Sequence, residues 1–263
     1  MESCKWQGTV TDFILAMNKN RIATLIQNVL QKYADSYNSE NFLDFELETI
    51  ANNAIWVAKK KYVQNIVWKD GKEYEPLSYI STKGLEIIQS STPAFCRTKL
   101  TDLVKFLFSK DKLDNDAISG LTQVLKDIKT QFKLADIEQI SSNRRIGDYN
   151  KFVVNDTNEF ELAKGCPIHV RAGGHHNYLI NNSKHKNNYD MIKTSDKIRW
   201  YYAADQFCDV FGYLPGEYPY QIAPKIDMER QFEMFILEPL NRIIIPSGMP
   251  RLNRSLAYTL SLF

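Results

Sequence analysis

The sequence predicts an α+β protein, and three observations lead to that class. Between the N-terminus and about residue 40, apolar residues recur at steps of three and four, which is typical of an amphipathic helix. Residues 62–80 instead alternate between two faces and contain Asp70-Gly71, a strong signal for a β-hairpin. Beyond Pro93 the helical spacing returns. Helices and antiparallel strands therefore occupy separate stretches of the chain.

The composition limits the classes of function. The 263 residues suffice for one or two domains, and 44% hydrophobic with 24% charged residues is an ordinary globular balance. A formal net charge of +2 means that any basic surface for nucleic acid is local. Four widely separated cysteines without a CxxC pair predict free thiols in a reducing cytoplasm. Without a membrane-spanning apolar run or a signal peptide, we expect a cytoplasmic protein with no membrane partner.

The N-terminal helix is expected to pack on the core. Thr9 or Thr11 is placed to cap its first turn. Its apolar face comprises Phe13, Ile14, Met17, Ile22, Leu25, Ile26, Val29, Leu30 and Tyr33. The next segment, residues 42–50, has apolar residues between acids. We interpret it as a strand that carries Glu46 and Glu48 on one face.

A basic run opens the predicted hairpin. Lys59, Lys60 and Lys61 precede Tyr62, and a strand continues from there to Asp70-Gly71, with residues 74–80 as the returning strand. Lysine heads beside an aromatic donor on a rigid β element suit a phosphate backbone or a minor groove. A solvated charge run is the alternative interpretation.

The second half of the chain is predicted from the same signals. Thr92 and Pro93 mark a helix start, and two helices follow around a polar break at residues 111–116. The sequence after Ala135 predicts many loops. A last helix is expected from residue 225 and should end near Pro239. We interpret the Asn-, Gly- and Lys-rich stretch with His175, His176 and His185 as an exposed loop, not a metal site.

Four blocks in order resemble the end of the palm in family B DNA polymerases, closest to the tailed-bacteriophage branch. The blocks here are KKKYxxN, a hairpin, KGLE and SSTP, and the corresponding sequence in that family reads KKRYxxN, followed by MGLE and SSTP. The matching residues here are Lys59, Lys60, Lys61, Tyr62, Asn65, Gly84, Leu85, Glu86, Ser90, Ser91, Thr92 and Pro93. The resemblance implies a partial palm over residues 1–92, a largely helical thumb with a β-rich tip over 93–245, and a flexible tail over 246–263.

The resemblance also implies which residues contact primer–template DNA. Lys60 corresponds to a residue that reaches the minor groove, Tyr62 to one that holds a primer phosphate, and Glu48 to a carboxylate near the metal site. Looser matches to thumb motifs, IEQISSNRRIGDY and CPIHVRA, add further candidates. The DNA-binding set is Lys59, Lys60, Lys61, Tyr62, Asn65, Ser141, Ser142, Arg144, Tyr149, His169 and Arg171.

The aspartate blocks that hold two Mg²⁺ ions in this family, D-x-x-S-L-Y-P-S and Y-x-D-T-D-S, do not occur in these 263 residues. The expected arrangement is a split polymerase, in which a partner chain supplies exonuclease, fingers and the D-T-D-S motif and holds most of the Mg²⁺ ligands. This chain alone is then inactive. A non-catalytic duplex-binding module and an engineered fragment are the alternatives. A bacteriophage origin implies the host cytoplasm.

The C-terminus ends in Thr-Leu-Ser-Leu-Phe, which is similar to the bacterial sliding-clamp-binding peptide Gln-Leu-Ser-Leu-Phe. The resemblance implies a clamp as a further partner, bound by Leu260, Leu262 and Phe263. Thr259 departs from the peptide at the position of the glutamine. Docking of the same residues onto the thumb is the alternative.

Overall fold

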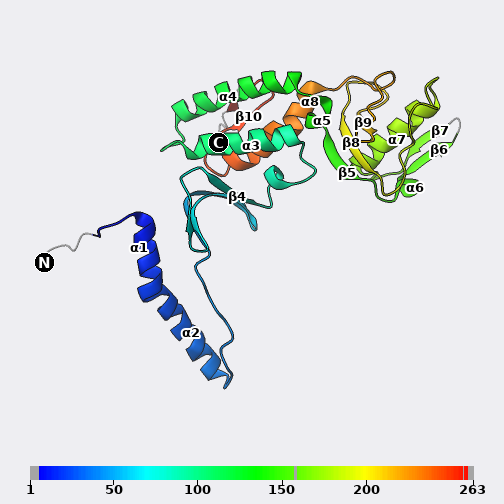
Figure 1. The fold of residues 1–263 in the computed structure, drawn as a ribbon. Coiled ribbons are helices and arrows are strands. Elements are labelled where there is room, and N and C mark those ends of the chain that lie inside the picture. The colour runs from blue at the N-terminus through cyan, green and yellow to red at the C-terminus, as the bar shows by residue number, and fades with distance from the viewer. Residues whose placement is uncertain (1–5, 157–158, 257, 260–263) are drawn as a thin grey trace. The chain divides into compact units, whose positions relative to one another are not determined.

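The structure is a computed structural model that describes residues 6–156, 159–256 and 258–259. Helices and antiparallel sheets make it a mixed α+β protein, as predicted. The described chain forms two compact units, one within residues 1–54 and 63–81 and the other within 55–62 and 82–263 (Figure 1). None of the helices in the described ranges is both long and apolar enough to cross a membrane.

The predicted N-terminal helix is present in the first unit. It consists of α1 (Val10–Met17), a π-helical turn η1 (Asn18–Ile22) and α2 (Ala23–Ser36). Thr9 caps it in a capping box, because the Thr9 hydroxyl accepts from the backbone of Asp12 at 3.1 Å and the Asp12 carboxylate accepts from Thr9.

The expectation that this helix packs on the core is wrong in the described chain. Ala34 is its only buried residue. The apolar face is exposed because no element of this unit covers it within the described residues. The exposed members are Phe13, Ile22, Leu25, Val29 and Tyr33.

The strand predicted from residue 42 begins later. Residues 39–48 are not in a strand, and β1 (Thr49–Ala58) starts after Glu48, which is exposed. Phe42 and Phe45 are exposed at 85% and 59%, so the alternation that suggested a strand does not mark a buried face. A strand requires a hydrogen-bonded neighbour, and pairing with the sheet starts at Thr49.

The predicted hairpin is confirmed. β2 (Lys61–Lys69) pairs with β3 (Lys72–Glu73) through a turn in which Asp70 and Gly71 have φ of 48° and 82°. The returning strand is shorter than predicted, because Pro76 lacks an N–H and Leu77 has a left-handed φ of 64°. β4 (Tyr79–Lys83) then pairs with β2, and the strand order is β1-β2-β3.

Two helices after Pro93 form the larger part of the second unit. α3 (Ala94–Phe108) follows the short η2 (Glu86–Ile88), and α4 (Asn115–Leu134) begins at its cap, Asp114. The two helices run side by side in Figure 1. Their buried leucine-rich faces exclude water from the contact, which is the main source of their stability. These faces comprise Leu100, Leu103, Val104, Leu107, Leu121, Leu125, Ile128 and Phe132.

The region after Ala135 contains a three-stranded antiparallel sheet of order β5-β8-β9. In chain order, the helices and strands of this region are α5 (Ile137–Ile140), β5 (Ser142–Arg145), α6 (Tyr149–Phe152), β6 (Val153–Asp156), β7 (Glu159–Leu162), α7 (Ile168–Asn181), β8 (Lys197–Tyr202) and β9 (Val210–Tyr213). Strands β8 and β9 pair antiparallel, and Trp200 lies opposite Gly212.

The prediction that His175 and His176 lie in an exposed loop is wrong. Both are buried in α7 at 3% and 1% exposure, and a Cβ added at Gly174 would lie only 3.1 Å from Cγ1 of Val153. The glycines that suggested a loop instead permit this close helix packing. His175 and His176 bond to the carbonyl oxygens of Val210 and Gly212 at 2.7 and 2.8 Å. They thereby satisfy polar groups of the edge strand β9.

The last helix passes Pro239 instead of ending there. It consists of α8 (Met228–Phe232), a π-helical turn η3 (Glu233–Leu237) and α9 (Glu238–Ile244). The π turn directly before Pro239 absorbs the missing N–H, so the helix continues. Two short strands, β10 (Arg251–Leu252) and β11 (Tyr258–Thr259), pair after it.

Candidate nucleic-acid interface

The lysine run forms the turn between β1 and β2. Lys59 and Lys60 are the two turn residues, and Lys61 is the first residue of β2. All three side chains are exposed, and Lys60 has a left-handed φ of 61°. Tyr62 follows, half-buried, with its ring 4.9 Å from that of Trp56. Because the hairpin fixes the backbone at this point, the ammonium groups are presented from a rigid base.

Gly84 supports this turn from the next motif along the chain. A Cβ added at Gly84 would lie 2.4 Å from the carbonyl oxygen of Lys60, and Gly84 has a φ of +66°. Both facts require glycine, since real Cβ atoms do not approach an oxygen so closely and left-handed backbone disfavours side chains. The lysine turn therefore rests directly on the KGLE segment.

A pocket of about 380 Å³ lies close to the other end of that segment. Its residues come from η2 and the Ser91-Thr92 turn, from β5 and β8, from the start of α7 and from the last helix. They are Glu86, Gln89, Ser91, Thr92, Ser142, Arg144, Ile168, His169, Trp200, Met234, Phe235, Pro239 and Arg242. Three residues predicted to bind DNA, Ser142, Arg144 and His169, thus meet in one place.

Hydroxyl groups tie the walls of the pocket together. The Ser142 hydroxyl donates to the carbonyl oxygen of Ser91 at 2.6 Å, which joins β5 to the SSTP turn. The Thr92 hydroxyl donates to the carbonyl oxygen of Glu86 at 2.7 Å. Because these bonds join hydroxyl groups to backbone atoms, they fix the shape of the pocket without using its charged side chains.

The charges in the pocket are mostly positive. Arg144 is exposed, and Arg242 forms an ion pair with Glu86. Burial, and then the nearby Arg144 guanidinium, lower the pKa of His169 below its ordinary value. His169 is therefore neutral at neutral pH in the free chain, and an anion that entered the pocket would favour its protonated form.

Four other residues predicted to contact DNA have side chains that already bond to other parts of the chain. Asn65 is buried and accepts from the backbone N–H of Leu77 at 2.8 Å. Ser141 donates to Ile137 at 2.7 Å, and the Tyr149 hydroxyl accepts from Asn177 at 2.8 Å, both away from solvent. Arg171 pairs with Asp209 at 2.9 Å. In this conformation Asn65 and Ser141 bond to the backbone, and Tyr149 and Arg171 bond to other side chains of the chain.

The described residues do not fit a magnesium site. No group of three His, Cys, Asp or Glu side chains in the described ranges could hold a metal ion. Glu48 is exposed beside the start of β1 and belongs to no such group. We assign no metal ligand to this part of the chain. The predicted clamp-binding residues Leu260, Leu262 and Phe263 lie outside the described residues.

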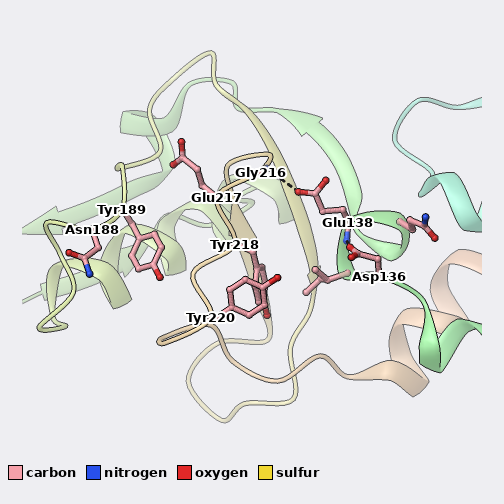
Figure 2. A pocket seen from close by; sticks show the side chains of 10 residues that line it. Asp136, Glu138, Asn188, Tyr189, Gly216, Glu217, Tyr218 and Tyr220 are labelled. Carbon is pink, nitrogen blue, oxygen red and sulfur yellow. Dashed lines mark hydrogen bonds between the residues drawn. The ribbon is translucent and has the colours of Figure 1, made fainter.

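A second pocket, of about 550 Å³, differs in chemistry. Figure 2 shows its tyrosines, Tyr189, Tyr218 and Tyr220, together with carboxylates such as Glu138, which accepts from the backbone N–H of Gly216 at 2.9 Å. Its charged side chains are all acidic, so it repels phosphate. The pocket that contains Arg144 and Arg242 is the one suited to nucleic acid.

Comparison with known families decides the class of protein. The sequence model of DNA polymerase family B matches residues 11–235. This chain belongs to the family B DNA polymerases. The match gives it a polymerase-related function, in a family whose members transfer nucleotides, bind DNA and use Mg²⁺. A comparison with curated proteins found no match.

Two residues of the basic pocket in this family B polymerase chain carry no signal in the sequence. Arg242 lies 156 positions from its partner Glu86, beyond the matched range, in a helix whose spacing indicates only core packing. Trp200 belongs to a strand of aromatic residues typical of a buried sheet. Only the fold brings them to Ser91, Arg144 and His169.

Proposed function

We propose that this chain is the C-terminal subunit of a split, bacteriophage-type family B replicative DNA polymerase and that it grips the primer–template duplex. The observation that carries the proposal is that the KGLE segment, residues 83–86, connects the lysine turn to the basic pocket. Gly84 supports the exposed lysine turn, and Glu86, two residues later, holds Arg242 in the basic pocket. Two basic surfaces are thereby fixed within one unit of the chain.

The lysine turn binds the duplex near the primer terminus. Lys60 reaches the minor-groove edge, where purine N3 and pyrimidine O2 acceptors are common to all base pairs. Tyr62 holds a primer-strand phosphate, and Lys59 and Lys61 neutralise others. The contact with the ring of Trp56, which is tilted by 59° to that of Tyr62, holds the Tyr62 ring for this task. The pocket with Arg144 and His169 contacts the backbone of the duplex farther along.

The partner chain supplies the metal-binding aspartates and covers the exposed face of the N-terminal helix. Leu25, Val29 and Tyr33 follow each other on α2 at 65%, 58% and 62% exposure. The π turn at Asn18–Ile22 changes the helical register between α1 and α2. An apolar face of this length is typical of an interaction site. Glu48 then lies near the carboxylates of the partner.

The tail supplies a third contact in this proposal. Leu260, Leu262 and Phe263 bind an apolar pocket of a sliding clamp, and the tether raises the effective concentration of the polymerase at the clamp. A palm portion over residues 1–92, a thumb over 93–245 and a tail from 246 complete the arrangement that we propose.

The test is reconstitution. The purified chain should incorporate no nucleotide with primer–template and Mg²⁺, and activity should appear in proportion to an added chain that carries the D-T-D-S motif. A neighbouring open reading frame that ends soon after that motif identifies the chain to add. Robust polymerisation by this chain alone would overturn the split arrangement. Duplex binding without any gain of activity from the partner would favour the alternative, a non-catalytic duplex-binding module.

A further inference from the structure

We propose that the pocket of about 380 Å³ is an oxyanion site that takes a single phosphate group, with Arg242 and Trp200 among its donors. The phosphate group that binds there belongs to the backbone of the DNA duplex, and this part of the proposal rests on the proposed function. No motif in the sequence indicates either residue. The charges, one unpaired donor and two helix starts at the pocket support it.

The charge balance favours an anion. Arg144 and Arg242 bring two positive charges to the pocket and Glu86 brings one negative charge, while His169 is neutral in the free chain and can take up a proton when an anion binds. Arg144 makes no ion pair within the described chain, whereas Arg242 pairs with Glu86. A guanidinium has five N–H donors, so Arg242 can keep Glu86 and still donate to a phosphate oxygen.

Trp200 contributes the second, independent observation. The residue lines the pocket and is 5% exposed, and its indole Nε1 has no hydrogen-bond partner in the described structure. A buried donor without a partner has lost its hydrogen bonds to water and gained none in return, so each such group calls for an explanation, and a bound ligand is one. A phosphate oxygen that enters the pocket offers the missing acceptor.

Two helices begin at the pocket. α7 has 14 residues and starts beside the lining residues Ile168 and His169, and α3 has 15 residues and starts just after Thr92. Each is preceded by a proline, Pro167 or Pro93, and neither has a side-chain cap on its first-turn N–H groups. The positive ends of both helix dipoles therefore add to the positive charge around the pocket.

Arg251 provides a matched control for Arg242. Arg242 is 55% exposed and pairs with Glu86, which is 22% exposed; Arg251 is 54% exposed and pairs with Glu238, which is also 22% exposed. Arg251 does not line the pocket. The variants Arg242→Gln and Arg251→Gln thus remove the same charge and the same kind of ion pair, but only the first removes a pocket donor.

The experiment measures two kinds of binding by the full chain. Sodium phosphate titrated by calorimetry reports on the pocket, and duplex DNA titrated at several salt concentrations reports on the backbone contact. Arg242→Gln should abolish the phosphate signal, weaken duplex binding roughly tenfold and reduce the slope of log K against log salt by about one. Arg251→Gln should match the wild type. Trp200→Phe keeps the ring packing and should weaken both ligands without changing the slope, because the lost donor is neutral.

The outcomes are distinguishable. Loss of phosphate binding in Arg242→Gln with unchanged duplex affinity and slope would mean that the pocket takes a free anion, which overturns the DNA source. An equal effect of both arginine variants would overturn the pocket itself. A wild-type chain that binds phosphate but no duplex would overturn the proposed function. Circular dichroism of each variant checks that it is folded.

Discussion

The carbonyl oxygen of Lys60 occupies the space in which a side chain at Gly84 would begin. The distance from that oxygen to a Cβ built at Gly84 is 2.4 Å, and the next nearest atom, Cγ of Lys61, lies at 3.0 Å. The glycine of the KGLE block and the lysines of the KKKY block therefore form one structural element, although 23 residues separate Lys60 from Gly84 in the sequence.

The first prediction concerns this contact. Gly84→Ala should lower the free energy of unfolding by more than Gly71→Ala, because Gly84 adds a backbone clash to a left-handed φ whereas Gly71 has open space around it. The left-handed conformation alone costs about 1–2 kcal/mol. Urea denaturation of both variants measures the difference. Equal losses would show that the turn can move away from residue 84 without cost.

The second prediction concerns Lys60 as a DNA ligand. Lys60→Ala should weaken primer extension by the reconstituted enzyme and reduce the salt slope of duplex binding by about one if the ammonium also neutralises a phosphate. Lys110→Ala is the control, since Lys110 is exposed and lies 4.8 Å from the Phe106 ring. Wild-type extension and salt dependence in the Lys60 variant would remove Lys60 from the interface.

The third prediction concerns stability at low pH. Burial lowers the pKa values of His169, His175 and His176 below the ordinary 6.5, so the folded chain binds fewer protons than the unfolded chain as pH falls. The stability that these groups contribute is complete above pH 6.5 and is lost as pH falls below it. Urea midpoints at pH 7.5 and 5.5 should show the loss. It should be smaller in His176→Gln than in His185→Gln, which keeps all three of these histidines.

The fourth prediction concerns the exposed face of α2. Leu25→Glu should abolish association with the partner chain and leave the unfolding free energy within about 0.5 kcal/mol of the wild type, because Leu25 is already 65% exposed. Thr24→Glu places the same charge at a neighbouring exposed position outside the apolar face and should still associate. Sedimentation of the two-chain mixture measures both. Association by Leu25→Glu as strong as the wild type would place the partner elsewhere.

The fifth prediction concerns the tail. Removal of residues 260–263 should leave distributive synthesis intact and abolish stimulation by a sliding clamp, because Leu260, Leu262 and Phe263 are the expected anchors. Product length with and without clamp is the measurement. A truncated enzyme that responds fully to the clamp would assign these residues to the fold of the chain.

The sequence by itself determined the local elements and the class of protein. The spacing of apolar residues, the cap at Thr9 and the Asp70-Gly71 turn depend on neighbouring residues, so the N-terminal helix and the hairpin could be predicted. The KKKY, KGLE and SSTP blocks carried the resemblance to a family that matches residues 11–235. The same local signals could not tell that Gly174 and His176 belong to a buried helix, because glycine and histidine are also common in loops.

Only the tertiary structure decided which groups meet. In the folded chain Asn65 bonds to the backbone of Leu77 and Tyr149 to the side chain of Asn177, while no element of its own unit covers the apolar face around Leu25 within the described residues. The approach of Gly84 to Lys60, the pairing of Glu86 with Arg242 and the unpaired donor of Trp200 depend on residues far apart in the sequence. Contacts of this kind leave no periodic pattern, since each is made once, by packing, and not by the repeat of a helix or strand.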